Sequence, residues 1–178
     1  MENSKTAFRD YLQLEKKYSP HTVNAYLNDL ISFETYIKTE FDSEDLLNVN
    51  YSLIRSWIVT LVDAQISNTS VNRKISSLKS YFKFLIREGV LVDNPMIKVV
   101  APKSKTRLPV FIEEQQIESL LNEVQFEDGF VGERNKLIIE LFYVTGIRLS
   151  ELINIKTQDI NFQNQAVKVL GKRNKERL

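Results

Sequence analysis

Apolar side chains recur at intervals of three and four residues through most of the first hundred positions, with short polar breaks between the runs. This spacing places them on one face of an α-helix. The pattern therefore predicts a bundle of about four or five amphipathic helices in this part of the chain. We expect the first over residues 4–17, the second from Ser19-Pro20 onward, the third over 51–65 and the fourth over 69–88.

Residues at the predicted helix ends support these limits. Ser19 is a favourable N-cap residue, and proline after it suits the first helical position. Gly89 ends the fourth helix because glycine readily adopts the left-handed conformation that follows helix ends. The residues expected to face the core are Val23, Tyr26, Leu27, Leu30, Phe33, Ile37, Ile54, Trp57, Ile58, Leu61, Val71, Ile75, Leu78, Phe82 and Leu85.

The helical pattern is interrupted in VVAPKSKTRLPVF, which holds two prolines and three cations and no acidic residue. Proline disfavours helix in the residue before it. We therefore predict a basic linker at residues 101–110, between a first domain of residues 1–100 and a second of residues 111–178. In the second domain the periodicity predicts helices within 111–124 and 133–146 and a short one within 148–156.

The last part of the chain has a different pattern. Apolar and polar residues alternate from Ala166 to Leu170, and Gly171 and a cluster of basic residues follow. This is typical of a β-strand that turns back on itself. We expect the chain to end inside this hairpin with an unpaired strand edge, which indicates a fragment of a longer protein.

Composition narrows the class of protein. The chain has no cysteine, so it forms neither a disulfide nor a thiolate metal site, and one histidine, His21, is a poor basis for a metal centre. No apolar run has the length of an export signal or a membrane span. We expect a soluble, cytoplasmic protein without a metal and without a membrane partner.

Charge is unevenly distributed although the net charge is only +1. Residues 1–100 carry 12 basic and 12 acidic side chains, residues 101–110 carry 3 and 0, and residues 111–178 carry 9 and 11. Only the linker has a single sign. Its Lys103 and Lys105 could follow a nucleic-acid backbone and release counterions. The alternative is a basic linker that is merely solvated.

The fourth predicted helix has a polar face opposite its apolar one. This face, called the basic face below, carries cations and hydroxyls at steps of three and four residues, a chemistry suited to phosphates and base edges. An ordinary solvated helix surface is the alternative. The residues of the basic face are Arg73, Ser76, Ser80, Lys83 and Arg87.

Arg148 and Glu151 are three residues apart at the start of a predicted helix, so their side chains share a face. A guanidinium held by a carboxylate is suited to a phosphate that gains charge during reaction. Lys172, in the basic turn, could give a proton to a leaving oxygen. A routine ion pair and a solvent-facing hairpin tip are the alternatives.

Taken together, TGIRLSELINIKTQDI and VKVLGKRNKERL resemble the opening motif and the hairpin of the catalytic domain of tyrosine recombinases of the phage integrase family, in their Xer-like form. YSPHTVNAYLNDLISF, NRKISSLKSYFKFLIREG and NPMIKVVAPK resemble the core-binding domain of the same proteins, so the likeness covers essentially the whole chain. It implies a mainly α fold, with an N-terminal SAM-like helical bundle followed by the start of an α+β catalytic domain.

The resemblance also implies roles for individual residues. Arg148 matches the first catalytic arginine, which grips the scissile phosphate, and Glu151 matches the acidic residue that supports it. Lys172 matches the lysine that protonates the leaving 5′ hydroxyl, and Lys175 is the alternative. Arg173 departs from the glycine that many relatives have there.

The reaction implied by the resemblance breaks and rejoins DNA through a 3′-phosphotyrosyl link, without a metal or nucleotide cofactor. The family also has a histidine just before a second arginine, a further histidine or tryptophan, and a nucleophilic tyrosine, and these are expected beyond residue 178. This chain is therefore expected to bind double-stranded DNA without cleaving it, and to act with other recombinase subunits in a tetramer when complete. A non-catalytic DNA-binding module and a helical protein-interaction domain are the alternatives. The choice between chromosome dimer resolution and movement of a mobile element stays open.

Overall fold

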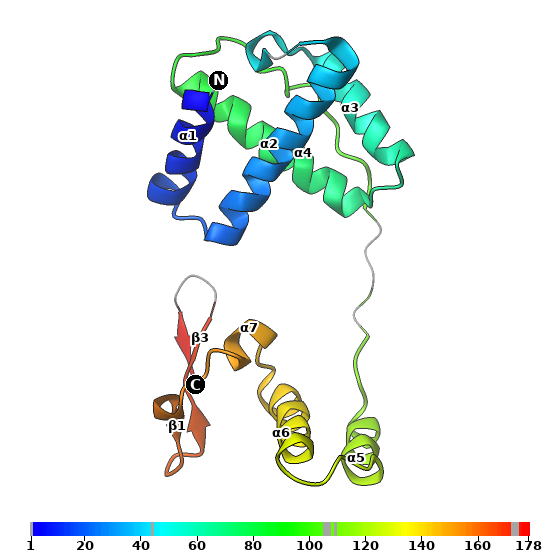
Figure 1. Ribbon diagram of the computed structural model, residues 1–178, viewed down its shortest axis with the longest axis vertical. Helices are drawn as coiled ribbons and strands as arrows, with labels where there is room; N and C mark the ends of the chain where they lie inside the picture. Colours follow the sequence, from blue (N-terminus) through cyan, green and yellow to red (C-terminus); the bar gives the residue numbers. More distant parts are fainter. Residues whose placement is uncertain (1, 44, 105–107, 109, 172–174) are drawn as a thin grey trace. The chain divides into compact units, whose positions relative to one another are not determined.

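The computed structural model describes residues 2–43, 45–104, 108, 110–171 and 175–178 (Figure 1). The chain divides into two compact units, Met1–Arg107 and Leu108–Leu178. The fold is mainly α, as predicted, with two small antiparallel hairpins in the second unit.

The first unit is a bundle of helices whose starts are fixed by side-chain caps. Ser19, Asn50 and Ser67 each accept a hydrogen bond from a backbone N–H three residues further on, which satisfies a group that the helix itself leaves unpaired. The predicted start at Ser19-Pro20 is therefore confirmed. The helical elements are α1 Glu2–Asp10, η1 Tyr11–Glu15, α2 Pro20–Phe41, η2 Leu46–Asn48, α3 Tyr51–Asp63 and α4 Asn68–Arg87.

The first predicted helix is not a single α-helix. α1 ends at Asp10, and η1 continues it as a π-helical turn in which the Lys16 N–H donates to the carbonyl oxygen of Tyr11 at 3.0 Å. Phe8 and Leu12 are both fully buried on either side of this change. Residues four apart share a face of a regular α-helix as well, so the apolar spacing does not distinguish this wider turn from an α-helical one.

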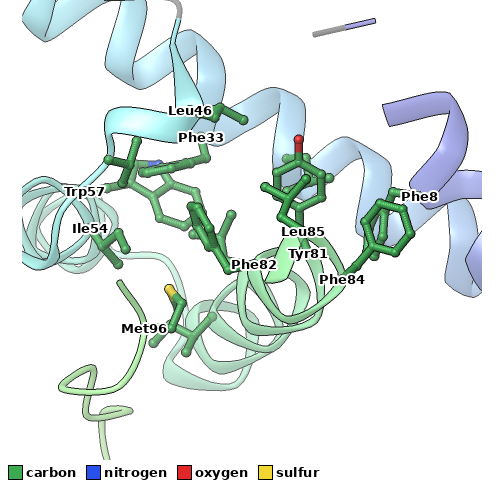
Figure 2. Packing of buried hydrophobic residues seen from close by; sticks show 14 of the residues in the cluster. Phe8, Phe33, Leu46, Ile54, Trp57, Tyr81, Phe82, Phe84, Leu85 and Met96 are labelled. Carbon is green, nitrogen blue, oxygen red and sulfur yellow. The ribbon is translucent and has the colours of Figure 1, made fainter. Parts of the chain in front are cut away.

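Helix α4 supplies much of the core of the first unit. All five of its predicted core residues are buried, and Ser77, Tyr81 and Phe84 are buried beside them. Figure 2 shows Tyr81, Phe82, Phe84 and Leu85 of this helix within the apolar cluster. Trp57 of α3 packs against Phe33 of α2, with 4.9 Å between ring centroids. The predicted core residues are thus buried or, for Tyr26, Leu27, Ile58 and Leu61, partly buried against the cluster. Phe8, Leu12 and Leu46 are core residues that the pattern did not identify.

The second unit has shorter elements and few buried apolar side chains. Among its described residues, the buried hydrophobic ones are Ile117, Ile147 and Val169. Many large apolar side chains stay exposed, Phe111 and Phe130 among them. The elements are α5 Glu114–Glu123, α6 Phe130–Thr145, α7 Leu149–Leu152, η3 Thr157–Asp159, β1 Ile160–Asn161, β2 Ala166–Val167, β3 Val169–Leu170 and β4 Glu176–Arg177.

The strand predicted over residues 166–170 is in fact two strands in two hairpins. β2 pairs with β1, which the sequence did not predict, and β3 pairs with β4 in the register Val169↔Arg177 and Leu170↔Glu176. Lys168 separates the two, and its N–H donates to the carbonyl oxygen of Asp159 at 2.8 Å. β4 is the returning strand, and in this two-stranded sheet one of its edges is paired with β3 and the other has no partner strand among the described residues, as expected. Alternation shows which residues share a face, but not which strand lies beside them.

No helix among the described ranges is long and apolar enough to cross a membrane.

The packing of α2 predicts a sharp contrast between neighbouring positions. Leu30 is fully buried, whereas the adjacent Ile31 is 51% exposed. We expect Leu30→Ala to lower the free energy of unfolding by about 2–5 kcal/mol, because it removes core contacts and leaves a cavity. Ile31→Ala, the matched control, should cost less than about 1 kcal/mol. Denaturant unfolding followed by the fluorescence of Trp57 measures both, and similar losses would contradict this packing.

Candidate functional site

A tight turn after α6 sets the position of Arg148. Gly146 ends the helix in the left-handed conformation, with φ 58°, and its N–H donates to the carbonyl oxygen of Phe142 at 3.0 Å. A side chain is unfavourable at such a φ, which explains glycine there. Ile147 then enters the interior, and Arg148 follows at the start of α7. The TGIR sequence thus reverses the chain and presents the arginine.

Glu151 is the centre of a small network of hydrogen bonds. Its side chain is only 4% exposed. Its Oε2 accepts from the backbone N–H of Arg148 at 3.0 Å, and its Oε1 accepts from Nη1 of the same residue at 2.8 Å. The predicted partnership of Arg148 and Glu151 is therefore present in the structure. The carboxylate holds the arginine by both its backbone and its side chain.

The carboxyl group of Glu151 is held in its charged form. The hydrogen bond from the backbone N–H of Arg148, and next those from the Arg148 and Arg177 guanidinium groups, lower its pKa from 4.5 to about 2, against the opposing effect of burial. A permanently charged acceptor gives stronger hydrogen bonds than a neutral one. Arg148 therefore has a firm anchor across the neutral pH range.

The side chain of Arg148 is anchored yet open to solvent. It is 64% exposed, and its Nε and Nη2 have no partner among the described residues. A guanidinium offers planar, paired donors that match two oxygens of a phosphate. This arrangement can bind a phosphate without first breaking the bond to Glu151.

Arg177 of β4 is part of this site, although the sequence did not point to it. Its Nη2 donates to Oε2 of Glu151 at 2.6 Å and to the carbonyl oxygen of Gly146 at 3.4 Å. The residue lies 26 positions from Glu151, so no local spacing connects the two. The only sequence signal was its place in the basic hairpin.

The predicted hairpin lysine falls outside the described residues. Lys172 belongs to the segment 172–174, and its backbone and side chain are not described. The N–H of Gly171 donates to the carbonyl oxygen of Lys175 at 2.7 Å, which closes the hairpin. The side chain of Lys175 is exposed. The choice between the two lysines therefore stays a prediction.

On α4, Arg73 of the basic face is engaged by a buried carboxylate. Its Nη1 forms a short hydrogen bond with Oδ2 of Asp29 on α2, and it also lies 3.4 Å from the carbonyl oxygen of Ala25. The Arg73 side chain remains 46% exposed. Its outer donors stay accessible while its inner edge is fixed.

Asp29 gathers further donors from the same helix. The hydroxyl of Ser77 donates to Oδ2 at 2.7 Å, and Nζ of Lys74 lies 3.3 Å from Oδ1. Asp29 is 1% exposed, so these bonds replace its contacts with water. This residue was not among those predicted from the sequence. The available signal was a carboxylate on the core-facing stripe of α2, between Tyr26 and Phe33.

Arg87, at the other end of the basic face, holds two parts of the bundle together. It donates to both carboxylate oxygens of Glu15, at 2.6 and 2.9 Å, and to Glu88 at 2.8 Å. Its guanidinium also lies 4.3 Å from the ring centre of Tyr11. The hydrogen bond from Arg87 lowers the pKa of Glu15. The donors of Arg87 are therefore occupied, unlike those of the middle of the face.

Three residues of the basic face remain between these arginines. Ser76 is exposed, and its hydroxyl donates to the carbonyl oxygen of Asn72 at 2.9 Å. Lys83 is exposed and forms no ion pair with any described residue, and Ser80 is half-buried. Lys83 is therefore the cation of this face that is most available to a ligand.

The start of the predicted linker is bound to α4. Nδ2 of Asn68 donates to the carbonyl oxygen of Lys103 at 2.8 Å, and Nδ2 of Asn72 donates to that of Pro102 at 3.0 Å. Lys103 is thereby held beside the first turns of α4, with its side chain exposed. Lys105 lies outside the described residues.

Comparison with protein families gives matches to two segments. Residues 6–89 match the family described as "Phage integrase, N-terminal SAM-like domain". Residues 110–178 match the one described as "Phage integrase family". Both quoted resemblances are therefore confirmed at the level of the family.

Curated relatives are similar along nearly the whole chain. Tyrosine recombinase XerC of Staphylococcus epidermidis is 38% identical over 177 residues, which cover 99% of this chain and 59% of that protein. XerC of Staphylococcus saprophyticus is 40% identical over the same shares of the two chains. XerC of Oceanobacillus iheyensis is 39% identical over 96% of this chain and 55% of that protein. This chain thus spans less than two thirds of the length of these relatives.

Solved structures share the fold. A lambda integrase dimer bound to a COC′ core site matches with a TM-score of 0.71 and 19% identity, covering 99% of this chain and 60% of that one. The Tn1549 transposon integrase in complex with a circular intermediate DNA matches with a TM-score of 0.70 and 20% identity, covering 93% and 52%. At such identities the likeness concerns the fold alone.

The burial of Asp29 predicts that its removal destabilises the first unit. Asp29→Ala leaves the Ser77 hydroxyl with only the carbonyl oxygen of Arg73, at 3.2 Å, as its acceptor, and it removes the anion that Arg73 and Lys74 share. We expect a loss of about 1–3 kcal/mol in the free energy of unfolding. Glu40→Ala, on the exposed end of the same helix, should change it by less than about 0.5 kcal/mol. Denaturant titration measures both, and equal effects would argue against a structural Asp29.

The network around Glu151 predicts an acid-dependent stability. Because its pKa is about 2 in the folded state and 4.5 without these contacts, the group stabilises the fold above pH 4.5. This contribution disappears as the pH falls through 2. Carbon NMR of the Glu151 carboxyl group should give a titration midpoint near 2. A midpoint near 4.5 would contradict the network, and Glu151→Gln identifies the resonance by its absence.

Proposed function

Because the chain belongs to the phage integrase family of tyrosine recombinases, we propose that it binds DNA and supplies part of the active site of a site-specific recombinase. The reaction is breakage and rejoining of DNA through a 3′-phosphotyrosyl intermediate, carried out by the complete protein. The observation that carries the proposal is the solvent-open guanidinium of Arg148, anchored on the buried carboxylate of Glu151.

Arg148 has the chemistry to stabilise charge on the scissile phosphate. As tyrosine attacks the phosphorus, negative charge grows on the non-bridging oxygens, and a fixed guanidinium offsets it without reorganising. Glu151 supplies this fixation from both ends of the residue, through the backbone N–H and through Nη1. Glu151 itself is turned inward and accepts hydrogen bonds only, so its role is to hold Arg148.

The basic turn of the hairpin is the proposed source of the proton for the leaving 5′ hydroxyl. An ideal Cβ on Gly171 would lie 3.3 Å from Oε1 of Glu151, so the backbone at this glycine is close to the carboxylate that holds Arg148. Lys172 is the next residue along the chain and remains our candidate for the general acid, with Lys175 as the alternative. A lysine near the phosphate can protonate the leaving oxygen.

The proposed DNA contact of the first unit is the basic face of α4 together with Lys103. Lys83 and the outer edge of Arg73 are exposed, and Asn68 and Asn72 hold the start of the linker beside the first turns of the same helix. Two structures with this fold are described as bound to DNA, which supports the same partner here. We include Lys105 and exclude Arg87 from direct contact, because Glu15 and Glu88 occupy its donors.

The complete protein is also proposed to assemble with further recombinase subunits on DNA. The lambda integrase structure is described as a dimer on a core site, which supports assembly on the DNA itself. Strand exchange joins two DNA duplexes, and each duplex is cleaved once on each of its two strands. Four active sites, and so four subunits, are therefore needed.

The experiment that tests DNA binding is a titration of this chain with fluorescent duplexes. One duplex carries a Xer-type recombination site and the other a scrambled sequence, each at low and moderate salt. Preference for the site together with a strong salt dependence supports the proposal, because phosphate contacts release counterions. Binding to neither duplex at low salt would contradict it and would favour the protein-interaction alternative.

Variants of the basic face sharpen this test. We expect Lys83→Ala to weaken binding to both duplexes and to reduce the slope of log K against log salt by about 1, as for one lost phosphate contact. Lys98→Ala removes the same charge from a turn outside α4, and its slope should equal that of the unchanged protein within error. Arg73→Ala should also weaken binding, but it additionally frees Asp29, so its unfolding must be measured in parallel. Equal slopes for the Lys83 and Lys98 variants would refute the assignment of this face.

A further inference from the structure

Two arginines from different elements share the carboxylate of Glu151. Arg148 donates its Nη1 to Oε1 at 2.8 Å, and Arg177 donates its Nη2 to Oε2 at 2.6 Å. The backbone N–H of Arg148 also donates to Oε2. Arg177 and the backbone N–H of Arg148 thus donate to the same oxygen, Oε2. The Nε and Nη2 groups of Arg148 stay open to solvent.

Arg177 also connects β4 to the turn that precedes α7. Its Nη2 lies 3.4 Å from the carbonyl oxygen of Gly146, two residues before Arg148. One guanidinium therefore bridges the end of the hairpin, the turn and the buried carboxylate. The Arg177 side chain is 43% exposed, so water competes with these contacts. They therefore affect the orientation of the bonded groups more than the free energy of unfolding.

The other strand of the hairpin reaches the same carboxylate. Gly171 follows β3, and an ideal Cβ there would lie 3.3 Å from Oε1 of Glu151 and 3.3 Å from the carbonyl oxygen of Lys175. These distances leave little room for a side chain. Both flanks of the basic turn, Gly171 and Arg177, are therefore placed against Glu151.

From this geometry we propose that Arg177 is a positioning residue for the reaction: it fixes the orientation of Glu151, and through it Arg148, and docks the hairpin that carries the basic turn. The inference rests on the proposed function, because it concerns the same phosphate site.

Electrostatics favour this role over a purely structural one. Two guanidinium groups and one carboxylate leave one net positive charge at the site, which suits an anionic ligand. Without Arg177, Glu151 would keep only the two hydrogen bonds from Arg148, so no described residue outside α7 and its N-cap would fix the carboxylate. Arg148 has Glu151 as its one side-chain partner among the described residues, so its order depends on that of the carboxylate.

The test compares three variants of this chain with the unchanged protein. Arg177→Gln removes the charged donor, and Arg177→Lys keeps the charge without the planar fork. Arg134→Gln removes an arginine of α6 whose one hydrogen-bond partner among the described residues is its neighbour Asn135. NMR measures the titration midpoint of Glu151, the exchange broadening of the Arg148 guanidinium protons, and the shift of these protons on addition of inorganic phosphate.

We expect Arg177→Gln to raise the proton affinity of Glu151 about tenfold, to broaden the Arg148 protons and to raise the phosphate concentration for half-saturation about fivefold. Arg177→Lys should give intermediate values, and Arg134→Gln should match the unchanged protein. The inference would be overturned if the Arg148 signals and the phosphate response of Arg177→Gln equalled those of Arg134→Gln, even if Arg177→Gln were less stable than the unchanged protein.

If Arg177→Gln does not fold, the comparison of Arg177→Lys with Arg134→Gln decides in the same way. The proposed function and the inference fail separately. Absence of any phosphate response by Arg148 in the unchanged protein would contradict the proposed function, whereas the Glu151 titration and the Arg148 broadening still decide whether Arg177 positions them.

Discussion

An ionised carboxylate that leaves water must receive hydrogen bonds on its oxygens, and this requirement shapes both units of the protein. Glu151 meets it with Arg148 and Arg177 in the second unit. Asp29 meets it with Arg73, Lys74 and Ser77 in the first. In each case the inner edge of an arginine is fixed while its outer side remains in solvent. Burial of the acid is therefore what turns a mobile cation into an oriented one.

Helix α4 combines this arrangement with the main packing of the bundle. Its apolar side fills the core, so the helix cannot rotate without exposing residues such as Leu78 and Phe82. Its basic face is thereby held in one direction. The same helix anchors the linker through Asn68 and Asn72. Burial of the apolar side of α4 thus sets the direction in which its basic face points.

Local sequence predicted most of the helices and their core faces, because apolar periodicity and capping residues act over only a few positions. The Arg148 and Glu151 pair was also predictable, since a spacing of three residues brings side chains together on any helix. The π-helical turn at Tyr11–Glu15 was not, because apolar spacing does not distinguish such a turn from an α-helical one. The hairpin formed by β1 and β2 was missed because two-residue strands are too short to show alternation.

The class of fold, the faces of the helices and the family could all be predicted from the sequence, since each depends on neighbouring residues or on motifs read in order. The pairing of cations with acids could not, because it depends on how the chain packs. Arg87 meets Glu15 across 72 positions, Arg73 meets Asp29 across 44, and Arg177 meets Glu151 across 26. Such pairs exist because packed helices and a closed hairpin bring distant segments within about 3 Å, a distance that no spacing along the chain encodes.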